Sequence, residues 1–134
     1  MSDTQKRDEF LRQAHIAVLA TVGHEGQPHA TPVWYLYEDG VFLIGVERTS
    51  VKHRNVRRNP RATLVVDQRE RPVRYVMAQG VAEVLPSLSE DVRLRLSLHY
   101  LGDAEGRQYY AETANLDFVT IVLRPHKFVG MDEG

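Results

Sequence analysis

The chain has 134 residues, of which 43% are hydrophobic and 26% are charged, a composition typical of a globular protein with one domain (1–134) and one core. Its formal net charge of -1 provides no overall attraction to nucleic acid or to an anionic membrane. The absence of cysteine excludes disulfides, thiolate metal sites and a cysteine nucleophile. Because the sequence shows neither a signal-peptide core nor an apolar run of membrane-spanning length, we expect a cytoplasmic protein.

The first third of the chain is expected to form a helix followed by strands. Apolar residues that recur one helical turn apart predict the helix over residues 4–14. Two glycines and a proline in residues 23–28 predict a turn, and Asp39 followed by Gly40 predicts a hairpin. Clusters of β-branched, aromatic and apolar residues predict the strands around these turns: residues 15–22, 30–37 and 41–46.

A short basic helix follows these strands. Thr49 and Ser50 are favourable N-caps, because their hydroxyls accept hydrogen bonds from N–H groups of the first turn; Asn59 precedes a proline and is a favourable end. Residues 48–61 contain six Lys or Arg and no Asp or Glu. The free N–H groups and dipole of a helix N-terminus favour an anion, and Lys52 in the first turn sharpens this feature into a phosphate site. The alternative is a solvated basic helix with no ligand.

The rest of the chain alternates strands with one helical region. A helix is expected from Ser89 to Leu101, with a break at residues 102–106 and a short helix over 107–113. Tyr109 in this short helix is compatible with lining a pocket, but a packing role is favoured. The remaining segments are expected to be extended, with a possible bulge at Gly80: residues 62–67, 73–85, 118–123 and 124–129. About six strands joined mostly by short turns predict a mainly β protein, a β-barrel with inserted helices.

Several motifs, in their order along the chain, carry a resemblance to a known family. They lie in residues 16–22, 26–35, 39–40, 50–61, 79–84 and 123–127, and include Ser50-x-Lys52-x-x-Asn55. In combination they resemble the split-barrel, FMN-binding-like superfamily of the pyridoxamine 5′-phosphate oxidases, and within it the small deazaflavin (F-420)-dependent reductases. The resemblance implies a split β-barrel homodimer with cofactor sites at the subunit interface.

The resemblance also implies which residues bind the cofactor. Lys52 corresponds to the cation that binds the phosphate, and Asn55 is expected to orient the loop. The tricyclic ring is expected to lie along the strands that contain residues 31–35 and 42–45. Trp34 is equally compatible with a packing role. The full set of implied cofactor-binding residues is Thr31, Pro32, Val33, Trp34, Gly45, Arg48, Thr49, Ser50, Lys52, Asn55, Gln79 and Gly80.

The function expected from this resemblance is that of a flavin-type oxidoreductase. Coenzyme F-420 or FMN would transfer hydride to or from a small organic substrate, and because the cofactor carries that chemistry, no catalytic residue is assigned. The alternative is a non-catalytic protein of the same fold that binds or carries FMN, F-420 or haem. Nucleic-acid binding through the basic helix is disfavoured by the near-neutral net charge. The six histidines lack metal-ligand spacing, so no metal site is expected.

Overall fold

A computed structural model describes residues 1–130, so the last four residues of the expected domain 1–134 lie outside the described part. Strands dominate the described chain, and helices are inserted between them. In chain order the elements are α1 (Asp3–Leu11), β1 (Ala17–Val22), the 3-10 turn η1 (His24–Gly26), β2 (Pro28–Val33), β3 (Leu36–Glu38), β4 (Val41–Glu47), α2 (Val51–Arg58), β5 (Arg61–Gln68), β6 (Arg74–Leu85), α3 (Glu90–Glu112) and β7 (Phe118–Gly130).

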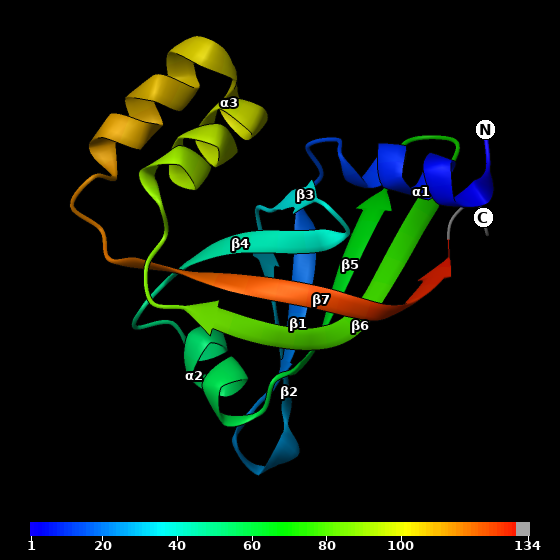
Figure 1. The fold of residues 1–134 in the computed structure, drawn as a ribbon, viewed down its shortest axis with the longest axis horizontal. Coiled ribbons are helices and arrows are strands. Elements are labelled where there is room, and N and C mark those ends of the chain that lie inside the picture. Colours follow the sequence, from blue (N-terminus) through cyan, green and yellow to red (C-terminus); the bar gives the residue numbers. More distant parts are fainter. Residues whose placement is uncertain (131–134) are drawn as a thin grey trace.

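The strands of the described residues form one seven-stranded antiparallel sheet in the order β2-β1-β5-β6-β7-β4-β3. The strands at its two edges, β2 and β3, follow one another in the chain and are separated only by Trp34 and Tyr35. Because so short a link joins the two edges, the sheet must curl into a half-barrel (Figure 1). The expected mainly β, split-barrel fold is confirmed.

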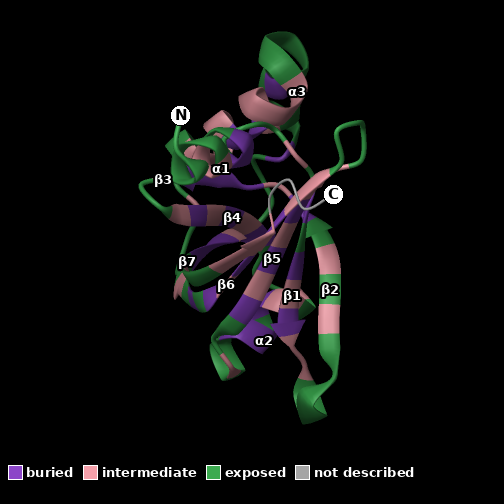
Figure 2. Cartoon of the chain, turned by 90° about the vertical axis from the view of Figure 1, so that its right-hand side faces the viewer, coloured by how far each residue is buried: buried purple, intermediate pink, exposed green. Residues whose placement is uncertain are grey.

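The core lies inside the curl of the sheet. Buried and less buried residues alternate along β4 and β5, as expected for strands with one face toward a core. Figure 2 shows buried residues along β1 inside the sheet, whereas the outer end of α3 is exposed. Tyr35 is fully buried and its hydroxyl donates a hydrogen bond to the Leu11 carbonyl oxygen at 2.8 Å. This bond fixes the end of α1 against the link between the two edge strands.

Two strand boundaries differ from those expected from the sequence. The strand expected over 30–37 is divided into β2 and β3, because the chain must pass from one edge of the sheet to the other at Trp34. The segments 118–123 and 124–129 form a single strand, β7. The bulge at Gly80 is confirmed by a register shift against β7. A Cβ atom on Gly80 would lie 2.1 Å from the Arg124 carbonyl oxygen, so only glycine permits this close approach of the strands.

The helical region α3 is a hairpin of two arms that stands at one end of the sheet (Figure 1). The chain reverses at Gly102, whose φ of 80° suits glycine. The arms pack closely, since a Cβ on Gly106 would lie 2.7 Å from the Ser97 carbonyl oxygen. An ion pair between Arg95 and Glu38 ties the first arm to β3. Within residues 1–130, no helix is both long and apolar enough to cross a membrane.

Candidate functional site

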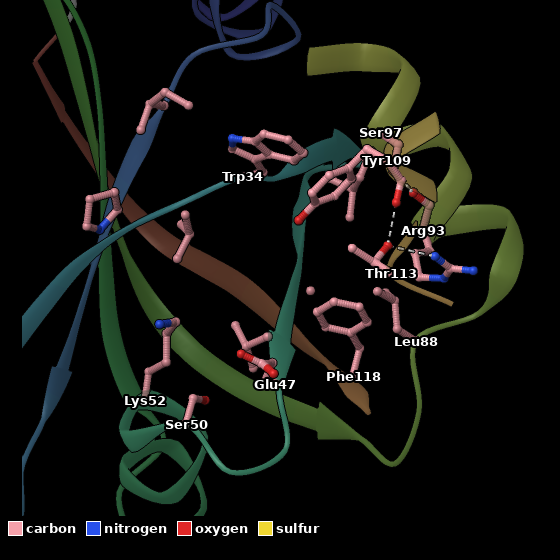
Figure 3. A pocket seen from close by; sticks show the side chains of 16 residues that line it. Trp34, Glu47, Ser50, Lys52, Leu88, Arg93, Ser97, Tyr109, Thr113 and Phe118 are labelled. Carbon is pink, nitrogen blue, oxygen red and sulfur yellow. Dashed lines mark hydrogen bonds between the residues drawn. The ribbon is translucent and has the colours of Figure 1, made fainter. Parts of the chain in front are cut away.

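A cavity of about 370 Å³ lies between the β2–β3 link, β4, the start of α2 and the α3 hairpin. Figure 3 shows side chains from all of these elements around it. Half of the cofactor-binding residues implied by the resemblance line this cavity, although they come from three separate segments of the chain. These residues are Pro32, Val33, Trp34, Gly45, Ser50 and Lys52.

The start of α2 forms the cationic end of the cavity. Ser50 is the N-cap of α2, with extended backbone angles, and its hydroxyl accepts a hydrogen bond from the His53 N–H at 3.3 Å. The Lys52 side chain is partly buried and points into the cavity (Figure 3). Among the described residues, the Lys52 ammonium has neither an ion-pair nor a hydrogen-bond partner. A partly buried cation without a partner favours an anionic ligand.

The other side of α2 is anchored to the sheet by buried polar groups. Asn55 does not line the cavity; its amide nitrogen Nδ2 donates to Thr21 Oγ1 on β1 at 3.0 Å, and its Oδ1 accepts from Arg58 at 2.9 Å. His53 is also buried, and its Nδ1 lies 2.7 Å from the Arg48 carbonyl oxygen. These contacts fix the direction of α2 and therefore the position of Ser50 and Lys52.

Three further implied residues lie outside the cavity. The Arg48 guanidinium pairs with Asp117 at 2.8 Å and donates to the Pro86 carbonyl oxygen at 2.7 Å. The hydrogen bond between Arg48 and Asp117 is the main reason why the pKa of Arg48 is raised and the pKa of Asp117 is lowered. The Thr49 carbonyl oxygen accepts a hydrogen bond from Arg54. Thr31 lies on β2, with a buried hydroxyl that has no partner among the described residues.

Gln79 and Gly80 lie in β6 and line a separate cavity of about 410 Å³, together with Arg61 and His126. They do not reach the cavity that contains Lys52. Gln79 is paired with Thr63 of β5, and its side chain is partly exposed. Within one chain, the structure therefore brings six of the twelve implied residues to the Lys52 cavity and two to the second cavity, while the other four line neither of them.

Aromatic side chains form another wall of the cavity. The Trp34 ring stacks on Tyr100 of α3 with centroids 4.7 Å apart and planes 6° apart, and it meets Tyr109 at 5.5 Å. The Tyr100 hydroxyl donates to the His15 carbonyl oxygen at 2.7 Å and accepts from the Tyr35 N–H at 3.1 Å. Burial raises the pKa of Tyr100 to about 12. One face of the Trp34 ring is thus covered by the neutral ring of Tyr100.

Several residues of the cavity were not predicted from the sequence, and for Tyr109 the sequence favours packing over lining a pocket. Leu88, Tyr109 and Phe118 reach it only because α3 and its flanking segments fold over β4, and no local pattern could have indicated this. Leu88 packs over Gly45, where a Cβ atom would lie 2.8 Å from Leu88 Cδ2. Glu47 could have been predicted as a cavity residue, because the two-residue period of a strand places it on the same face as Gly45. Among the described residues that line the cavity, it is the one with a carboxylate, and this negative charge opposes an anion beside Lys52.

No set of three or more His, Asp or Glu side chains within residues 1–130 is arranged to hold a metal ion. The polar groups that line the cavity are instead the Lys52 ammonium, the Arg93 guanidinium, hydroxyls and one carboxylate. Such a donor set suits a phosphate or carboxylate group attached to an organic ligand.

The curled antiparallel sheet and the cavity at its edge define a split β-barrel protein. Over residues 3–131 the chain matches the pyridoxamine 5′-phosphate oxidase family, and it belongs to that family. The name of the family is that of an oxidoreductase. The resemblance to pyridoxamine 5′-phosphate oxidases that the sequence motifs indicated is therefore confirmed.

Individual relatives are similar to this chain to different degrees. A 5a,11a-dehydrotetracycline/5a,11a-dehydrooxytetracycline reductase of Streptomyces rimosus is 35% identical over 95 residues, which are 65% of this chain and 67% of that protein. The structure of an F420 reductase superimposes with a TM-score of 0.75 at 26% identity, covering 91% of this chain and 94% of that one. The haem storage protein HutZ of Vibrio cholerae shares the fold, with a TM-score of 0.72 at 17% identity, covering 98% of this chain and 96% of that one.

Proposed function

We propose that this chain is a cytoplasmic, single-domain oxidoreductase that binds coenzyme F-420 or FMN and transfers hydride to or from a small organic substrate. The observation that carries this proposal is the unpaired Lys52 ammonium beside the Ser50 cap, at one end of a cavity lined by sheet residues. The cavity volume lies within the range typical of small-molecule sites. The names of the F420 reductase and of the dehydrotetracycline reductase support a reductase.

The residues present fit a cofactor of this kind. Lys52 and the free N–H groups at the start of α2 would hold the phosphate, while Pro32, Val33 and Gly45, which line the same cavity, would border the ring. The bound cofactor would supply the hydride chemistry. The contribution of the chain would be to bind and orient the cofactor and to exclude water, with α3 covering one side of the cavity.

We also propose that the protein acts as a homodimer, through the outer face of the sheet. Val18 is paired with Val65, and Val65 with Met77, so these apolar side chains form a row across β1, β5 and β6. Val18 is 37% exposed, and Ile16, on the same face and at the cavity, is 52% exposed. Burying such a row against a second copy is favourable. Gln79 continues this face, and a second subunit is the means by which it would reach a cofactor.

Two cofactor titrations and a turnover assay test the proposed activity. Purified protein is titrated with FMN and, separately, with F-420, and binding is followed by the change in cofactor fluorescence. The bound cofactor is then reduced and its reoxidation by added quinones and enones is measured against free cofactor. Saturable binding with accelerated reoxidation is expected. Binding without acceleration would instead favour the carrier function, and failure to bind either cofactor would refute the proposal.

A further inference from the structure

The cavity has two ends of different chemistry. The end at α2 contains the Lys52 ammonium, whereas the end at α3 is bordered by large apolar and aromatic side chains from segments far apart in the chain (Figure 3). These side chains are Trp34, Leu88, Leu96, Tyr109 and Phe118. The Arg93 guanidinium also lines this end, but it already donates to the Tyr110 carbonyl oxygen and to the Thr113 hydroxyl. A phosphate-bearing cofactor accounts for the first end. The second end is larger and more aromatic than the anchoring of a phosphate requires.

Trp34 is built as a fixed platform. Its ring is parallel to that of Tyr100, within 6°, and Tyr100 is itself fixed by hydrogen bonds to two backbone groups, at His15 and Tyr35. Because Tyr100 occupies one face of the indole, the orientation of Trp34 does not depend on a ligand. Tyr109 approaches Trp34 at an interplanar angle of 53°, so the two rings diverge and form an aromatic corner rather than a closed stack.

Tyr109 is held in place by the structure of the hairpin while its ring stays available. The side chain is 38% exposed, and its hydroxyl has no hydrogen-bond partner among the described residues. Its neighbour Tyr110 is used internally: the Arg93 guanidinium lies 3.9 Å from the Tyr110 ring centroid and donates to the Tyr110 carbonyl oxygen at 2.7 Å. Arg93 and Gly106 lock the two arms together, so they act as positioning residues for Tyr109.

We infer that this aromatic corner is the substrate subsite, and that it selects a planar, conjugated ring system over an aliphatic compound of similar size. A flat ring stacked on Trp34 or Tyr109 removes exposed aromatic surface from water and gains the preference of π systems for offset or tilted contact. The inference rests on the proposed function, because the cofactor ring along β2 and β4 would lie next to this subsite. Trp34 and Tyr109 are thereby specificity-determining residues.

Binding of two small probes to the purified protein, with and without saturating cofactor, tests this inference. The probes are 1,4-naphthoquinone, which is planar and conjugated over two rings, and cyclohexane-1,4-dione, which carries two carbonyl groups without a conjugated ring. Calorimetry gives both dissociation constants. Quenching of tryptophan emission gives an independent readout, because Trp34 is the only tryptophan in the chain. We expect the naphthoquinone to bind at least tenfold tighter and to quench the emission.

Variants separate stacking from general disturbance of the fold. Tyr109→Leu should weaken naphthoquinone binding by roughly three- to tenfold, the equivalent of one aromatic contact, while Tyr109→Phe keeps the ring and should stay within about twofold of wild type. Phe128→Leu is the matched control, because Phe128 is a partly buried aromatic residue of β7 whose ring lies under Arg7, outside the cavity. None of these changes should alter the affinity for FMN or F-420.

Three results would overturn the inference: equal binding of the two probes, no effect of Tyr109→Leu on naphthoquinone affinity, or competition between naphthoquinone and the cofactor for one place. Failure of the proposed function gives a different result. In that case neither FMN nor F-420 binds, while naphthoquinone binding to the cofactor-free protein, with its dependence on Tyr109, would still support the aromatic subsite.

Discussion

Replacing Asn55 with alanine is expected to destabilise the fold by removing the anchor between α2 and β1. Asn55 and Thr21 are each 3% exposed, and the Nδ2–Oγ1 distance between them is 3.0 Å. Asn55→Ala leaves the Thr21 hydroxyl without this partner in a buried site, which costs about 1–3 kcal/mol. The free energy of unfolding from urea denaturation measures the loss. Asn115→Ala, at an exposed position, is the control and should change stability by less than about 0.5 kcal/mol.

A double-mutant cycle isolates the contribution of the contact itself. Thr21→Val alone leaves the Asn55 amide unsatisfied, so it too is expected to destabilise the protein. In the double variant both partners are gone, and the loss should be smaller than the sum of the single losses by about 0.5–1.5 kcal/mol. Additive losses would show that the two side chains do not stabilise one another, and the anchoring of α2 through this bond would then be refuted.

Three further predictions concern the bulge, the cavity and the end of α1. Gly80→Ala should lower the free energy of unfolding by at least about 1–3 kcal/mol, because its Cβ would collide with the Arg124 carbonyl oxygen; an unchanged urea midpoint would contradict this. Glu47→Gln should tighten FMN binding by up to about 1 kcal/mol, by removing the carboxylate that shares the cavity with Lys52; weaker binding in fluorescence titrations would contradict it. Burial lowers the pKa of His15 below its usual value near 6.5. The unfolded chain therefore takes up this proton more readily than the native protein, and stability should fall as the pH drops from about 7.5 to about 5. The melting temperature of His15→Gln should fall less over that interval, and an equal fall would remove His15 as a contributor.

Local signals in the sequence were sufficient for the framework of the fold. Hairpin residues, β-branched clusters and the cap at Ser50 act over a few residues, so the strand positions and α2 follow from them directly. The sequence also indicated that Lys52 and Trp34 belong to one site, although they are 18 positions apart in the chain. That indication came from the order of family motifs, and the cavity brings both residues together.

Other features depend on tertiary structure and could not be read locally. The division of the strand at Trp34 follows from the closure of the sheet, because the two edge strands are consecutive in the chain. Local patterns in the sequence predict only that the helix breaks near Gly102. That the two arms fold onto each other depends on the packing of Ser97 against Gly106. The positions of Tyr109 and Phe118 in the cavity depend on that packing.

The affinity of Lys52→Ala for FMN and for F-420 tests the central claim most directly. Loss of a charge-assisted contact to the phosphate should weaken binding of the preferred cofactor by about 1–3 kcal/mol, or roughly 5- to 150-fold in dissociation constant. Arg57→Ala removes the same charge from an exposed position of the same helix and should have less than a twofold effect. If both variants bind as the wild type does, or if both lose affinity equally, the cofactor phosphate is not held by Lys52 and the account is contradicted.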